Sequence, residues 1–213
     1  MQGCQVYSKV KPAVKVQPLA DQHRRIGIYG GTFNPVHNAH LLVADQVGHA
    51  LCLNKVKLMP DAIPPHVDHK DAVSGDLRLQ MMELAIQGNP LLGIERTELD
   101  RGGVSYTYDT MEQLTRQHPD TDYYFIIGGD MVDYLDKWHR IDDLIKLPRF
   151  HFVGVQRPHA KNATKYPVIW VDIPEVDISS SDIRERIRRG QSVNYLLPTK
   201  VADFIKEHHL YHD

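Results

Sequence analysis

The chain alternates between short runs of consecutive apolar residues and longer segments in which apolar residues recur every three or four positions. The short runs predict buried strands, and they lie at 26–29, 56–59, 91–94, 123–127, 150–155 and 168–171. The helical spacing predicts helices, which lie at about 41–51, 74–87, 110–117, 141–147, 182–189 and 199–208. Strands that alternate with helices favour an α/β fold with a doubly wound, mostly parallel sheet and helices on both faces. Ligands of such sheets bind beyond the carboxyl ends of the strands.

The first residues do not follow this pattern. Pro12 and Pro18 interrupt a mixed polar and apolar stretch, and regular alternation starts only near Arg25. We therefore predict a tail of uncertain order over residues 1–24 and one domain over residues 25–213, which is long enough to bury a single core.

Composition and charge narrow the classes of protein. A formal net charge of -2 argues against nucleic acid as the main partner. No window reaches the ~18 apolar residues of a membrane helix, and no apolar secretory segment is evident, so we expect a cytoplasmic protein without a membrane partner. The two cysteines carry no metal-ligand spacing. The oligomeric state stays open, with a homo-oligomer among the options.

The segment after the first strand, Gly30–His40, is the first candidate for chemistry. Two glycines let the backbone turn tightly and approach a ligand. The loop then opens a helix, whose N-terminal N–H groups attract phosphate. His37 and His40 are three residues apart, so they share one helix face and can both donate to phosphoryl oxygens. Taken by themselves they are better explained as two surface histidines, and it is their place in this loop that favours phosphate binding. The lack of Cys or acidic partners at ligand spacing disfavours zinc.

Two further segments also lie beyond the carboxyl ends of predicted strands, where ligands are expected to bind. Ser179–Ser181 precede a helix that carries Arg184, a set that can hold phosphate or simply cap a solvated helix. Gly128–Met131 follow the most apolar strand and are followed by Trp138. A tryptophan there can stack on an aromatic base, although a core position at a helix junction is the alternative.

These segments together resemble a known family, the bacterial nicotinate-mononucleotide adenylyltransferases of the nucleotidyltransferase superfamily. Gly30–His40 resembles the motif GGTF-x-P-x-H-x-G-H. The other matching segments are Pro64–His66, Gly103–Thr110, Phe125–Asp130 with Trp138, and Ile178–Arg184. They occur in the family's order over about residues 25–211. Ala39 and Asn34 depart from the family's usual Gly and Asp, and Val67 stands where a basic residue is common.

The resemblance implies a Rossmann-like fold and an enzyme that transfers AMP from ATP to nicotinate mononucleotide, giving deamido-NAD and pyrophosphate in NAD biosynthesis. It implies that His37 and His40 are catalytic. The ATP-binding residues that it implies are Gly30, Gly31, Thr32, Phe33, His40, Gly128, Asp130, Ser181 and Arg184. The mononucleotide-binding residues that it implies are Asn34, His66, Thr107 and Trp138. Mg²⁺ is expected to bind mainly through the ATP phosphates rather than through a protein metal site.

Other interpretations stay open at this point. One is a sister transferase acting on phosphopantetheine, on glycerol phosphate or on the amide mononucleotide, although the Ser105–Thr107 and Trp138 segments argue against the first two. Another is a regulatory module that binds nucleotide without catalysis. A fragment related to aminoacyl-tRNA synthetases is disfavoured by the absence of a basic surface and of an anticodon domain. The roles of Lys70 and Arg157 are not defined by the sequence.

Overall fold

The structure, a computed structural model, describes residues 23–64, 72–156 and 163–212. Its strands are β1 (Arg24–Gly31), β2 (Lys55–Pro60), β3 (Leu92–Ile94), β4 (Thr121–Gly128), β5 (Phe150–Val155) and β6 (Val168–Val171). Its helices are α1 (Asn38–Ala50), α2 (Gly75–Ala85), α3 (Thr97–Arg101), α4 (Thr107–Gln117), α5 (Gly129–Val132), α6 (Ile141–Leu144), α7 (Ser180–Arg188) and α8 (Thr199–Glu207), with a 3-10 turn η2 (Leu135–Lys137). None of the helices in these ranges is long and apolar enough to cross a membrane.

The six strands form one sheet in the order β3-β2-β1-β4-β5-β6, and every neighbouring pair is parallel. β1 lies in the middle, with Ile26 opposite Lys55 of β2 on one side and Tyr123 of β4 on the other. From β1 the chain adds β2 and β3 on one side of the sheet, and it then adds β4, β5 and β6 on the other side. Open α/β sheets bind ligands at the point where this direction changes, which here lies between β1 and β4. The predicted doubly wound architecture is confirmed, and the described strands are parallel throughout.

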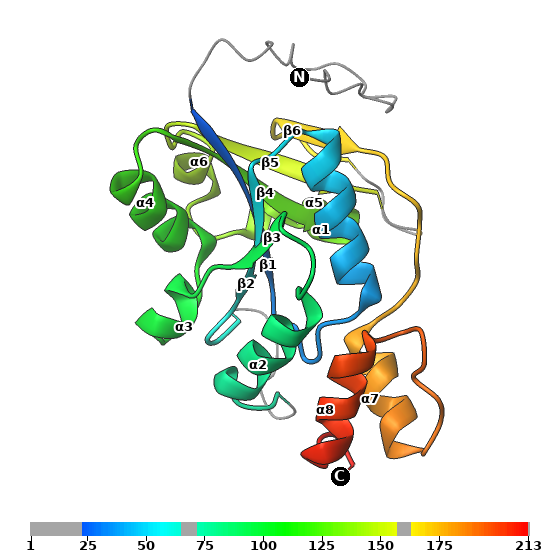
Figure 1. Cartoon of the computed structure of the whole chain (residues 1–213). Coiled ribbons are helices and arrows are strands. Elements are labelled where there is room, and N and C mark those ends of the chain that lie inside the picture. Colours follow the sequence, from blue (N-terminus) through cyan, green and yellow to red (C-terminus); the bar gives the residue numbers. More distant parts are fainter. Residues whose placement is uncertain (1–22, 65–71, 157–162, 213) are drawn as a thin grey trace.

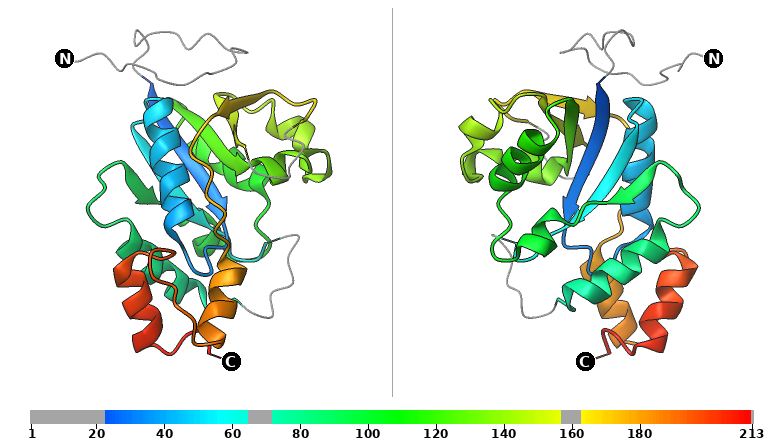
Figure 2. Two further views of the ribbon diagram at one scale, coloured as in Figure 1. Left: turned by 90° about the vertical axis from the view of Figure 1, so that its right-hand side faces the viewer. Right: turned by 60° about the vertical axis from the view of Figure 1, so that its left-hand side comes forward.

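Two apolar clusters cover the two faces of the sheet. On one face, α1, α2, α7 and α8 contribute the buried side chains Val43, Val47, Met81, Met82, Ile183, Val201, Phe204 and Ile205. On the other face, α4 and α6 contribute Tyr108, Met111, Leu114, Ile141 and Leu144. Figures 1 and 2 show α7 and α8 side by side at the end of the molecule where β1 terminates. The carboxyl edge of the sheet is therefore bordered by the C-terminal helices.

The predicted elements agree with the structure except at some ends. β5 and β6 have the predicted bounds, whereas α4 begins three residues before the predicted start, at Thr107. α6 stops at Leu144 rather than at 147, because residues 145–147 continue as tighter turns before Pro148. α3 and α5 were not predicted, since four or five residues are too few to show helical spacing. Most of the predicted tail, residues 1–22, lies outside the described residues, and β1 already starts at Arg24.

Candidate active site

The glycine-rich loop after β1 leads directly into α1, and its two histidines lie against each other. His37 caps α1 with an extended backbone, and its N–H donates to Nδ1 of His40 over 3.2 Å. The two imidazole rings stack at 3.5 Å between centroids with 22° between their planes. Phe33 meets His40 edge to face, with 4.9 Å between ring centroids. The predicted proximity of the two histidines is confirmed.

This contact fixes the protonation pattern of His40. Because Nδ1 accepts a hydrogen bond, a neutral His40 imidazole carries its proton on Nε2. His40 is half-buried, whereas His37 is only 2% exposed. His40 is thus the better placed of the two to donate a hydrogen bond from Nε2 to an anion at the N-terminus of α1.

The N-terminal turn of α7 is docked onto the same loop. Ser179 caps α7 by accepting from the N–H of Asp182 at 3.1 Å. Ser180 Oγ donates to the carbonyl of Pro35 at 2.9 Å, and Arg184 Nη1 donates to the carbonyl of Asn34 at 2.8 Å. The N-termini of two helices of at least nine residues, α1 and α7, therefore meet at one edge of the sheet, and this brings together two partial positive charges.

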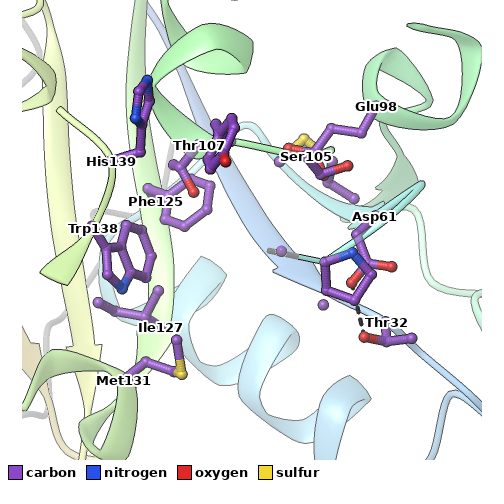
Figure 3. Close-up of a pocket in the computed structure, with 15 residues that line it drawn as sticks. Thr32, Asp61, Glu98, Ser105, Thr107, Phe125, Ile127, Met131, Trp138 and His139 are labelled. Atoms are coloured by element: carbon purple, nitrogen blue, oxygen red, sulfur yellow. Dashed lines mark hydrogen bonds between the residues drawn. The ribbon is translucent and has the colours of Figure 1, made fainter. Parts of the chain in front are cut away.

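A cavity of about 430 Å³ opens beside the loop, between the ends of β1, β2 and β4. Its wall is largely apolar and aromatic, with a few polar groups, as is usual for a small-molecule site. The lining residues include Gly30, Gly31, Thr32, Asp61, Glu98, Ser105, Tyr106, Thr107, Phe125, Trp138 and His139. Figure 3 shows His139 and Trp138 at one side of this pocket and Thr32 and Asp61 at the other.

One side of the pocket carries two buried carboxylates. Asp61 accepts from Thr32 Oγ1 at 2.8 Å and forms a salt bridge of 3.3 Å with Arg78. The Arg78 side chain is 4% exposed and also donates to the backbone carbonyls of Thr32 and Asp61. Glu98 is 4% exposed, and burial raises its pKa although hydrogen bonds from Thr110 and Ser105 act in the opposite direction. This side of the pocket therefore disfavours a further negative charge.

The start of α4 adjoins this acidic side, because Thr110, three residues after Thr107, donates to Glu98 at 2.9 Å. Tyr106 is the N-cap of α4, so Thr107 is the first residue of a helix of 11 residues whose unpaired N–H groups begin at the pocket. The positive end of that helix favours an anionic group beside Thr107. Trp138 meets Phe125 and Phe152 edge to face, and its ring is half-buried. His139 is exposed and packs on the ring of Tyr106 at 4.4 Å.

The structure groups the predicted site residues into two neighbouring sets. Gly30, Gly31, Thr32, Thr107 and Trp138 line the pocket. His37, His40, Ser181 and Arg184 lie at the two helix N-termini, while Gly128 is the N-cap of α5 and Asp130 is exposed in the first turn of that helix. Phe33 and Asn34 are buried, with 2% and 4% of their surface exposed, so they line the interior side of the loop. His66, Lys70 and Arg157 lie outside the described residues.

Several pocket residues were not predicted from the sequence. Asp61 follows β2 at the same sheet edge, so the position of the strand end was the signal that could have identified it. His139 adjoins Trp138, and Tyr106 adjoins Thr107. Glu98 and Arg78 offered no comparable signal, because each is brought to the site by tertiary packing. Within the described ranges, no group of three His, Cys, Asp or Glu side chains is arranged to hold a metal ion.

Comparison with known sequences gives a consistent picture. Residues 28–186 match the family described as cytidylyltransferase-like. The chain is 61% identical over 201 residues to a probable nicotinate-nucleotide adenylyltransferase of Streptococcus pyogenes serotype M1, covering 94% of this chain and 95% of that protein. It is 57% identical over 189 residues to a probable nicotinate-nucleotide adenylyltransferase of Lactiplantibacillus plantarum, covering 89% of each chain.

Comparison with solved structures extends the similarity of the fold. A Plasmodium falciparum nicotinic acid mononucleotide adenylyltransferase complexed with NaAD superposes with a TM-score of 0.75 at 21% identity, covering 89% of this chain and 98% of that chain. The same protein complexed with APC gives a TM-score of 0.74. These likenesses show that the fold is shared.

Proposed function

Because the chain belongs to the cytidylyltransferase-like family and, within it, to the nicotinate-nucleotide adenylyltransferases, we propose that the loop after β1 and the adjoining pocket form its active site. The enzyme transfers the adenylyl group of ATP to the phosphate of nicotinate mononucleotide. The products are the deamido form of NAD and pyrophosphate, which places the reaction in NAD biosynthesis. ATP as co-substrate favours a cytoplasmic location.

One observation supports this proposal most directly: a phosphate-binding surface lies next to an aromatic pocket. The loop after β1 carries the stacked pair of His37 and His40, and the N-terminus of α7 docks on it. The same loop lines the pocket through Gly30 and Gly31. Two nucleotides can therefore bind side by side over the carboxyl edge of the sheet, one on the loop and one in the pocket.

The reaction makes modest demands on the protein. The second pKa of a phosphate monoester is about 6, so the mononucleotide phosphate is largely ionised at neutral pH and attacks the α-phosphorus of ATP without a general base. The bond from the α-phosphorus to the bridging oxygen breaks, and that oxygen leaves with pyrophosphate. The protein supplies alignment and stabilisation of charge. In our assignment His40 donates to the α-phosphate, and Ser181 and Arg184 hold the phosphates that leave.

The polarity of the pocket orients the mononucleotide. Its ring stacks on Trp138, and the ring carboxylate points to the N-terminus of α4 at Thr107. A neutral amide in place of the carboxylate loses the interaction with the helix dipole. The helix N-terminus therefore favours the acid mononucleotide over the amide.

Mg²⁺ is expected to arrive with ATP. The groups on the loop and on α7 are backbone N–H groups, imidazoles and a guanidinium, which suit phosphate oxygens rather than a cation. Mg²⁺ is then held by phosphate oxygens and water, as it prefers in nucleotide sites. When bound, it neutralises part of the triphosphate charge.

The test is a measurement of pyrophosphate release from ATP and Mg²⁺ with either nicotinate mononucleotide or nicotinamide mononucleotide. We expect release with both, with kcat/KM about two- to fivefold higher for the acid because of the helix dipole at Thr107. Equal kcat/KM values would refute the role of α4 in selecting the acid. Absence of release with both substrates would refute the proposed function, provided that the protein binds ATP in the same buffer.

A further inference from the structure

The loop that carries the two histidines is held by the C-terminal part of the chain. Besides the bonds from Ser180 and Arg184, the backbone N–H of Asn38 donates to the carbonyl of Leu196 at 2.9 Å. The side chain of Asn38 donates to the carbonyl of Tyr195 at 2.6 Å. The outer side of the loop is therefore attached to residues more than 140 positions further along the sequence.

Tyr211, which follows α8, makes the most distant of these contacts. Its hydroxyl donates to Oδ1 of Asn34 over 2.7 Å, across 177 positions of sequence. The same oxygen accepts from the backbone N–H of Val73, just before α2, at 3.3 Å. Asn34 is 4% exposed, and its carbonyl is the one that Arg184 contacts. Tyr211 thus reaches the residue at which three separate parts of the chain meet.

The surroundings of Tyr211 keep its hydroxyl protonated and in place. Its ring packs against the apolar cluster beneath α1, α7 and α8. Burial raises the pKa of the Tyr211 phenol, while the charges of Arg184 and Arg78 act in the opposite direction without reversing the shift. The hydroxyl is therefore a hydrogen-bond donor throughout the neutral pH range.

We propose that Tyr211 is a positioning residue for adenylyl transfer: its hydroxyl fixes the side chain of Asn34 and thereby the loop that presents His37 and His40 to ATP. The inference rests on the proposed function, since it assigns Tyr211 to the same reaction. Asn34 precedes the first of these histidines by only three residues, and catalysis is sensitive to displacements of about 1 Å in such a loop. Tyr211 does not line the pocket and acts only through Asn34.

The variant Tyr211→Phe tests this assignment, because it removes the hydroxyl and keeps the ring that packs on the core. Loss of this partly buried hydrogen bond to the loop should lower kcat by about 3- to 10-fold. KM for the mononucleotide should stay within about twofold, since the pocket keeps all its lining residues. Amide hydrogen exchange in residues 32–41 should become faster.

Tyr123→Phe is the matched control. Tyr123 is buried, and its hydroxyl donates to the carbonyl of Leu114 at 3.5 Å on the face of the sheet covered by α4. This variant removes a buried phenol hydroxyl remote from the loop, so kcat and exchange in residues 32–41 should match the parent. A double-mutant cycle with Asn34→Ala adds a second criterion: Tyr211→Phe should have little further effect on kcat once Asn34 is truncated.

The outcomes separate the two proposals. If Tyr211→Phe is folded and has the parent kcat and exchange rates, the positioning role is refuted. The role is also refuted if its loss of kcat is fully additive with that of Asn34→Ala, because Tyr211 then acts by another route. If the parent releases no pyrophosphate, the proposed function fails, and the exchange rates of residues 32–41 alone decide whether Tyr211 fixes the loop.

Discussion

The imidazole of His40 is fixed by its neighbours rather than by its own helix position. His37 stacks on one face, and Phe33 and Tyr29 meet it edge to face at 4.9 and 5.9 Å. The backbone N–H of His37 determines which nitrogen carries the proton. A side chain held in this way loses little conformational entropy when it meets a phosphate.

We expect His40→Ala to lower kcat by about 10²–10³-fold, the usual cost of removing one hydrogen-bond donor to a transition state. The protein should remain folded, because His40 is only half-buried. Steady-state pyrophosphate release and circular dichroism measure the two effects. His49→Ala, an exposed substitution in the last turn of the same helix, should keep the parent kcat. Parent-like turnover in folded His40→Ala would remove His40 from the mechanism.

The sequence predicts the positions of those candidate residues that local geometry brings together. Gly30, Gly31 and the two histidines occupy a strand end and the helix start that follows it, so spacing alone predicted that they cluster. Tyr211 could not be found in this way, since its partner Asn34 is 177 positions away. Arg78 likewise contacts Thr32 across 46 positions of sequence. The pattern of the helix that carries Arg78 gives no sign of this contact.

Among the elements, α7 begins two residues before the predicted start at 182. The sequence offers the serines before this helix as capping residues, and Ser179 is the N-cap in the structure. What the sequence did not show is that α7 docks on the loop through Ser180 and Arg184, because a cap and a phosphate site use the same residue types. The shorter α3 and α5 were missed because tertiary packing, not periodicity, defines them.

Ser179→Ala should lower the free energy of unfolding by about 1 kcal/mol, since an N–H at the first turn of α7 loses its acceptor. Urea denaturation measures the change. Ser179→Asp supplies another good capping side chain and should retain most of the stability. If the Ala and Asp variants unfold at the same urea concentration as the parent, the cap contributes nothing to α7.

At the scale of the whole molecule, two carboxyl groups near the carboxyl edge give opposite dependences of stability on pH. Burial opposes ionisation of Glu95, but hydrogen bonds from Lys57 and Thr97 outweigh it and lower the pKa of Glu95. Burial raises the pKa of Glu98. Glu95 therefore stabilises the fold at neutral pH and loses this contribution as the pH falls through its folded-state pKa. Glu98 decreases stability as the pH rises from about 4.5 through its folded-state pKa.

Glu98→Gln should accordingly raise the free energy of unfolding at pH 7, because the amide needs no ionisation in a buried site. The gain should shrink toward pH 4, where the parent carboxyl is protonated in both states. Glu95→Gln is the matched comparison, and it should destabilise the protein at pH 7. Thermal unfolding of the three proteins between pH 4 and 7 measures these differences. A Glu98→Gln variant less stable than the parent at every pH would contradict the sign of the effect.

The central place of β1 in the sheet has a consequence for biosynthesis. β1 is made early, but its partner β4 lies almost a hundred residues later, with Ile26 opposite Tyr123. At translation rates of 5–20 residues per second, β1 waits roughly 5–20 s for that partner. During this interval β2 and β3 can pair on one side of β1, but the edge of β1 that will pair with β4 stays open. The half-made sheet is therefore most exposed to pairing with other chains before β4 has been synthesised.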